Sequence, residues 1–253
     1  MPNIKTYTCS HLDRPLVLDG FISDPAWKNI PWTDDFQDIT GDPALKPRFR
    51  TRAKMAWDDT YFYVAAEMEE PHVWGTITQQ NEVIFHDNDF EVFIDPDADS
   101  NNYYEFEMNA LGTIWELSLP VPYSEGGKPI LGCNLPGLIR KVGVRGKLND
   151  PTTEDIGWSV EIAFPWKELA KYNPNRATPP QPGDMWKVNF SRVQWQHEVT
   201  DGQYVRIPPH GTDLSSGLNP EDQQHPEDNW VWSPQGAVNM HIPKHWGEVI
   251  FEL

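Results

Sequence analysis

Cysteine and basic residues are both scarce in this sequence. The 253 residues include 2 cysteines, and 20 Lys and Arg stand against 38 Asp and Glu, for a formal net charge of −18 at pH 7. This charge repels phosphate backbones and anionic lipid surfaces, so it argues against nucleic-acid binding and membrane adsorption. Two cysteines, Cys9 and Cys133, do not make a disulfide framework, and both one bridge and two free thiols fit the sequence.

Long apolar runs and familiar enzyme motifs are also missing. No segment approaches the roughly 20 apolar residues of a membrane-spanning helix, and residues 1–20 lack the apolar segment of a signal peptide. This pattern is typical of a cytoplasmic protein, or of a secreted or periplasmic one whose signal has been removed. The motifs G-x-S-x-G, H-E-x-x-H, G-x-G-x-x-G and the phosphate-binding loop are absent.

Alternation of apolar and polar residues dominates the sequence, with the period of two that is typical of strands. Strands are expected over residues 49–57, 61–68, 88–95, 103–109, 112–119, 141–148, 157–164, 184–193 and 247–253. Helical signal is limited to a capped turn at residues 24–27 and a short helix at 165–171.

Many short strands, 24 prolines and 17 glycines indicate an all-β chain. The predicted fold is an antiparallel β-sandwich of jelly-roll or immunoglobulin-like type with one or two short helices. We expect one domain over residues 1–253, in which residues 207–228 form a long polar loop.

Twelve tryptophans are the most unusual feature of the composition. Trp57, Trp158 and Trp186 are in phase with apolar neighbours on strands, so we expect them in the core. Five others lie in or beside loops: Trp74, Trp195, Trp230, Trp232 and Trp246. An exposed indole can stack on a sugar ring, which hides about 80 Å² and is worth roughly 2 kcal/mol. The alternative is that these rings close the ends of the sandwich.

Several polar side chains project from the strand faces opposite the core. Glu91, Glu105, Glu107 and Asn109 are either a solvated outer surface or a concave face that binds hydroxyl groups. Asn189 and Arg192 are candidates to join them from a later strand. Paired glutamates also suggest the acid and base of a glycoside hydrolase, Glu91 with Glu105 or Glu107.

A short acidic segment, Asp95, Asp97 and Asp99, places oxygen ligands at alternate positions. Ser100 and Phe106 stand where an EF-hand loop needs glycine and glutamate, so this segment is not an EF-hand. A polar hairpin turn is the simpler interpretation, and a structural calcium site is the other. No cofactor is required by any other part of the sequence.

Several segments, taken in order, resemble family 9 carbohydrate-binding modules and the related DOMON-like sandwiches. LDG at residues 18–20 with DPAW at 24–27 resembles the family's opening DG…DxxW, and NDFEVFID at 88–95 resembles its DSVEVFID strand. The other matching segments are MAWDDTYFYV at 55–64, YYEFEMN at 103–109, GWSVEIAFPW at 157–166, residues 183–192, WSP at 232–234 and GEV at 247–249. The resemblance covers nearly the whole chain.

The resemblance implies a jelly-roll sandwich whose two aromatic rings hold a terminal sugar while polar side chains bind its hydroxyls. Carried over by position, the rings correspond to Phe85 and Trp232. The polar ligands correspond to Glu91, Asn109 and, near the last strand, Asn229. The chain departs from the family where Phe85 replaces a tryptophan and where Glu107 occupies the place of a basic sugar ligand.

These observations predict a protein that binds a mono-, oligo- or polysaccharide without turning it over, in a context of polysaccharide degradation. The predicted ligand-binding residues are Phe85, Glu91, Glu107, Asn109, Arg192, Asn229 and Trp232. Protein partners are not indicated by the sequence. A glycoside hydrolase is the alternative, and a haem-binding relative that uses Met68 or Met108 is a further one, for which no histidine partner is evident.

Overall fold

Most of the expected strands form where the alternation places them in this computed structural model, which describes residues 3–207 and 227–253. The first eight strands are β1 (Thr6–His11), β2 (Gln37–Asp38), β3 (Thr51–Trp57), β4 (Tyr61–Glu69), β5 (Asp89–Asp95), β6 (Tyr103–Asn109), β7 (Ile114–Leu119) and β8 (Ile130–Leu131). The others are β9 (Ile139–Arg145), β10 (Gly157–Pro165), β11 (Met185–Gln194), β12 (His197–Thr200), β13 (Gln203–Arg206), β14 (Asp228–Val231) and β15 (Gly247–Glu252).

Within residues 3–207 and 227–253, helical structure is confined to short segments, as expected. The α-helix is α1 (Trp166–Leu169). The 3₁₀ turns are η1 (Pro25–Asn29), η2 (Ile84–His86), η3 (Tyr123–Glu125), η4 (Ala170–Tyr172) and η6 (Pro243–His245). Most of the long loop expected at residues 207–228 lies outside the described residues.

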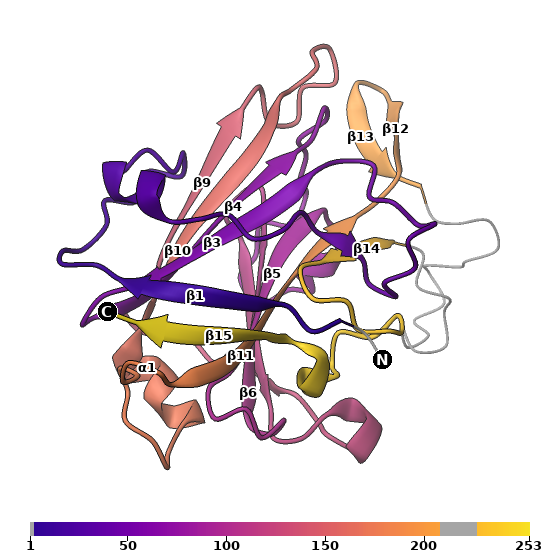
Figure 1. Cartoon of the computed structure of the whole chain (residues 1–253). Helices are drawn as coiled ribbons and strands as arrows, with labels where there is room; N and C mark the ends of the chain where they lie inside the picture. Colours follow the sequence, from indigo (N-terminus) through magenta and orange to yellow (C-terminus); the bar gives the residue numbers. More distant parts are fainter. Residues whose placement is uncertain (1–2, 208–226) are drawn as a thin grey trace.

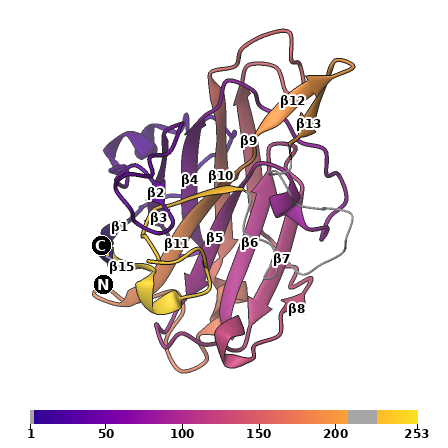
Figure 2. The same ribbon diagram turned by 90° about the vertical axis from the view of Figure 1, so that its right-hand side faces the viewer.

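All the described strands except β12 and β13 form one curled sheet that folds into two layers, which confirms the predicted β-sandwich (Figures 1 and 2). The order in the sheet is β8-β7-β6-β5-β11-β15-β1-β3-β4-β10-β9, and β14 pairs with β11 and β2. Most pairs are antiparallel. Strand β1 is an exception because it lies parallel to both β15 and β3. The strands β12 and β13 form a separate hairpin.

The main core lies between the layers and is rich in aromatic rings. From β6, the ring of Phe106 meets that of Phe164 on β10 edge-on, with centroids 5.5 Å apart. Met68 and Met108, the residues considered as haem ligands, are both fully buried in this core. Packing of apolar surface between the layers is the dominant stabilising contribution to such a sandwich.

A second apolar cluster covers part of the outer face of β5, β6 and β7. It contains Phe93 of β5, Tyr103 of β6 and Leu117 of β7, together with Val231 and Trp246 from the C-terminal region. Every residue of β5 and of β6 is buried, including those that point away from the main core. The polar residues of these strands are therefore not a simple solvated surface.

The DG…DxxW segment has a structural role. Glu161 of β10 accepts hydrogen bonds from the backbone N–H groups of Asp19 and Gly20, at 2.9 and 2.7 Å, and from the indole N–H of Trp27 at 2.8 Å. Asp24 caps the turn η1 by accepting from the backbone N–H of Ala26. These bonds fasten the N-terminal segment to the outer side of the second layer.

Both cysteines are free thiols, Cys9 buried and Cys133 partly buried, so they are not bridged. Within the described residues, no helix has the length and apolar character needed to cross a membrane.

Candidate functional site

Strand register gathers acidic side chains on the outer face of β5, β6, β7 and β11. Glu91 of β5 stands opposite Glu107 of β6 and Ser191 of β11. Glu107 in turn stands opposite Trp115 of β7. Since residues in register on neighbouring strands share a face of the sheet, these four side chains form one row.

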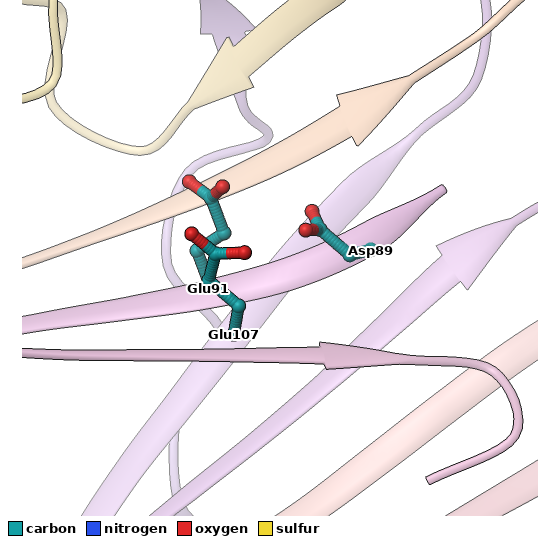
Figure 3. Close-up of side chains that lie close together, drawn as sticks. All are labelled: Asp89, Glu91 and Glu107. Carbon is teal, nitrogen blue, oxygen red and sulfur yellow. The ribbon is translucent and has the colours of Figure 1, made fainter. Parts of the chain in front are cut away.

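We call Asp89, Glu91, Glu105 and Glu107 the acid cluster. One carboxylate oxygen each from Asp89, Glu91 and Glu107 lies within 4.8 Å of the other two, and all three side chains rise on the same side of the sheet (Figure 3). The four residues are at most 5% exposed. Four carboxyl groups therefore share a small, nearly dry volume.

Burial raises the pKa of every carboxyl in the acid cluster. For Glu91 the pKa rises to about 8, because burial is the largest effect and outweighs the opposing effect of the neighbouring Ser191 hydroxyl. The pKa values of Asp89, Glu105 and Glu107 rise well above their usual range, first through burial and then through repulsion by Glu91. Burial thus favours the neutral, protonated form of each of these carboxyls when no cation is near.

Neighbouring groups hold the acid cluster from several elements. The backbone N–H of Phe85, on η2, donates to Glu107 Oε2 at 3.2 Å. The hydroxyl of Ser191 donates to Asn229 Oδ1 at 2.6 Å. The structure thus brings Phe85, Glu91, Glu107 and Asn229 of the predicted set to one region of the outer face.

A partly exposed aromatic pair borders the acid cluster. The rings of Phe85 and Trp115 have centroids 6.0 Å apart and are tilted by 40°. Of the twelve tryptophans, Trp115 and Trp32 are the two that keep partial exposure. Trp32 lies over Arg52 and Lys54 on the other layer, away from the acid cluster.

The loop tryptophans do not provide stacking platforms. Each of Trp74, Trp195, Trp230, Trp232 and Trp246 is at most 3% exposed. Trp232, the expected partner of Phe85, belongs to the main core and packs on Phe190 and Tyr7. Phe85 instead packs against a separate cluster around Trp195. The predicted Phe85–Trp232 platform is therefore corrected, because burial in the core covers the ring of Trp232.

Asn109 is also committed to structure. Its side-chain N–H groups donate to Ile77 O and Asp87 Oδ2, both at 2.9 Å, and its Oδ1 accepts from the backbone of Leu111 and Thr113. All its usual hydrogen-bonding positions are occupied. The expectation that Asn109 binds hydroxyls is thus corrected to a role in fixing the turn after β6.

Arg192 points to the opposite side of its strand from the acid cluster. It is in register with the core residue Phe90, whereas its neighbour Ser191 is in register with Glu91. The guanidinium lies fully buried beside Glu70, at 3.1 Å. The alternation of side chains along a strand therefore excludes Arg192 from this face, which corrects the expected ligand role.

The Asp95, Asp97 and Asp99 segment forms a turn whose carboxylate oxygens come within 4.8 Å of one another. Asp95 accepts hydrogen bonds from the backbone of Ala98 and Ser100. Burial, and then the charges of Asp97 and Asp99, raise the pKa of Asp95 to about 7. The calcium site expected here stays a prediction.

Trp115 is a candidate that sequence reasoning missed. Its signal is the alternation of residues 114–119, which puts Trp115 and Leu117 on the same face as Glu107 and Glu105 once β6 and β7 are paired. Pairing partners are not visible in the alternation of one strand.

These features define a β-sandwich that carries an acidic and aromatic patch on one outer face. The family model described as carbohydrate family 9 binding domain-like matches residues 18–178, and the chain belongs to this family. No curated protein gives a significant match.

Solved structures with a similar fold include two proteins. One, from Bacteroides uniformis ATCC 8492, is provisionally described as carbohydrate-binding and has a TM-score of 0.66 and 17% identity over 99% of this chain and 100% of its own. The other is a family 9 carbohydrate-binding module from Caldicellulosiruptor kristjanssonii in complex with cellotriose or with glucose. Its TM-score is 0.59 at 14% identity in both complexes, over 98% of this chain and 94% or 96% of its own. At these identities the likeness is one of fold.

Proposed function

We propose that this protein binds carbohydrate without turning it over, on the outer face of β5, β6, β7 and β11. The observation that carries the proposal is that Phe85 and Trp115 form a partly exposed aromatic pair directly beside Glu107. Aromatic faces next to hydrogen-bonding carboxyls suit a sugar, which has apolar C–H faces and polar edges. Membership of the family, and a similarly folded module that binds cellotriose and glucose, support it.

In this proposal each group has a distinct role. Trp115 and Phe85 stack on the sugar ring, while Glu107 and Glu91 accept or share protons with its hydroxyls. Asn229, held by Ser191, borders the same face and offers its amide. Stacking that hides about 80 Å² contributes roughly 2 kcal/mol, and a few hydrogen bonds add to it against the cost of association. The expected affinity is about micromolar to millimolar.

The test is calorimetry with glucose, cellotriose and a panel of soluble polysaccharides. Trp115→Ala is expected to weaken binding at least about tenfold, because the loss of stacking exceeds the 1.4 kcal/mol that a tenfold change requires. The matched control is Trp32→Ala, which removes the other partly exposed indole from the opposite layer and should leave affinity unchanged. Equal affinity of Trp115→Ala and the unaltered protein, or no binding to any member of the panel, would overturn the proposal.

Hydrolysis gives a separate outcome, measured as release of reducing ends from the same panel of polysaccharides. A raised carboxyl pKa, as at Glu91, is what a catalytic acid needs. However, Glu91 and Glu107 lie side by side on neighbouring strands (Figure 3), whereas a glycosidase pair flanks the bond that it cleaves. Release of reducing ends that disappears in Glu91→Gln would favour the hydrolase over the binding protein.

A further inference from the structure

The acid cluster has no cationic partner among residues 3–207 and 227–253. No Lys or Arg there lies within ion-pair distance of its four carboxyls. The basic side chain nearest to it is His241, whose Nε2 is 3.9 Å from Glu105 Oε2. Burial lowers the pKa of His241 to about 4, so this imidazole is neutral at pH 7. Buried carboxyls without a partner are protonated or bound to a metal.

The geometry of three members suits an oxygen-ligated cation. One oxygen each of Asp89, Glu91 and Glu107 lies within 4.8 Å of the other two (Figure 3). Calcium–oxygen distances are about 2.3–2.6 Å, so two ligands on opposite sides of one ion are roughly 5 Å apart. All the donors are hard oxygens, which favour Ca²⁺ and Mg²⁺ over softer metals.

Two oxygens with no hydrogen-bond partner give a second, independent observation. Asp89 Oδ2 and Glu105 Oε2 are buried without a partner. Glu105 comes from outside the group of three and stands two residues from Glu107 on the same face of β6, so its carboxyl borders the same volume. Glu161, also buried, has both oxygens satisfied by N–H donors. Orphaned buried oxygens are rare in native proteins, and a bound ion is one of the groups that satisfy them.

We propose that Asp89, Glu91 and Glu107 bind a divalent cation of the Ca²⁺ type, with Glu105 beside it. The cation supplies the positive charge that the described side chains do not. This site shares Glu91 and Glu107 with the proposed sugar site, but its affinity for a cation can be measured without any sugar present. The two functions are compatible on one face, since a carboxylate has about four lone-pair sites and a cation uses only part of them.

The experiment uses the full chain, first treated with a chelator and then titrated with Ca²⁺ or Mg²⁺. Calorimetry and thermal unfolding are followed up to about 10 mM cation, above the range of weak calcium sites. Calcium is expected to bind and to raise Tm, because a ligand that binds only the folded state stabilises it. Glu107→Gln and Asp89→Asn should each weaken calcium binding at least about tenfold.

Controls distinguish this site from the acidic turn and from a folding defect. Asp97→Asn, in the turn of Asp95 and Asp99, should bind calcium at the acid cluster as the unaltered protein does. In chelator, Glu107→Gln should unfold at the same temperature as the unaltered protein or higher, since it replaces a buried acid by an uncharged side chain of nearly the same shape. The proposal is overturned if calcium leaves Tm unchanged, if Glu107→Gln binds as well as the unaltered protein, or if Asp97→Asn alone abolishes binding. Sugar affinity, measured separately, decides the proposed function.

Discussion

The guanidinium of Arg192 illustrates a buried charge that is completely paired. It donates to Glu70 Oε2 at 3.1 Å, to Thr51 Oγ1 at 2.9 Å and twice to Gln194 Oε1, and it lies 5.1 Å from the ring centre of Trp230. Burial lowers the pKa of Arg192 to about 10, with the charge of Glu70 acting against that shift. The group therefore stays charged at neutral pH, and its role is to neutralise Glu70 inside the sandwich.

Arg192→Ala is expected to lower the free energy of unfolding by about 3–5 kcal/mol, because it leaves the carboxylate of Glu70 buried without its partner. The control, Arg50→Ala, breaks a pair with Glu69 in which both side chains are close to half exposed and a longer one with Glu67, which keeps Arg52 as its partner, so it should cost at most about 1 kcal/mol. Urea unfolding measures both. Equal losses in the two variants would contradict the assigned role of Arg192.

At the scale of residues, the sequence shows which side chains could bind a sugar, but not which other residues those side chains contact in the folded protein. Glu91 and Glu107 were expected on one face because alternation and spacing place them there, and strand pairing brings them together. Trp232 and Asn109 have side chains that suit a sugar, but packing on Phe190 and hydrogen bonds to Asp87 use them for structure. Such partners come from distant parts of the chain, so a local pattern does not reveal them.

The positions of most long strands can be predicted from the sequence, because apolar residues alternate with more polar ones along each of them. Strand β1 was missed, since its six residues bury only Tyr7 and Cys9 and its alternation is correspondingly weak. The parallel pairing of β1 with β15 and β3 cannot be predicted from the local sequence either, because it brings together strands from both ends of the chain. The antiparallel expectation therefore fails at this strand alone among the long core strands.

The loop before η1 depends on one close backbone contact. Gly20 has φ +90°, and a Cβ built on it would lie 2.5 Å from the carbonyl carbon of Val142 and 2.7 Å from the nitrogen of Gly143. Gly183 also has φ +90°, but a Cβ there meets nothing within 4 Å. The two glycines share the same backbone conformation and differ in their surroundings.

Gly183→Ala should therefore cost about 1–2 kcal/mol, the strain of an L-residue in the left-handed region. Gly20→Ala should cost about 2 kcal/mol more, because the backbone of β9 has to move away from the added methyl group. Denaturant unfolding of the two variants isolates the contribution of the contact. If both variants lose the same stability, the close approach of the Gly20 loop to β9 does not exist in solution.

Net charge acts on the whole molecule rather than on any one site. With 20 Lys and Arg against 38 Asp and Glu, ion pairs such as Arg48 with Asp228 still leave an excess of 18 negative charges. Uncompensated like charges repel one another more strongly in the compact state than in the expanded unfolded chain. Salt shortens the range of this repulsion, from about 30 Å at 0.01 M to about 3 Å at 1 M.

We expect Tm in chelator to rise as sodium chloride increases over that range, by about 2–4 °C for each kcal/mol of repulsion that is screened. Surface ion pairs weaken at the same time, but each is worth at most about 1 kcal/mol, so the repulsion of the excess charge dominates. A variant with Lys at the exposed positions Glu82, Glu154 and Glu252 changes the net charge from −18 to −12, since each substitution adds two charges. Its Tm should rise less with salt, because less repulsion is left to screen. A Tm that falls with salt, or that responds equally in the two proteins, would show that local pairs outweigh the net charge.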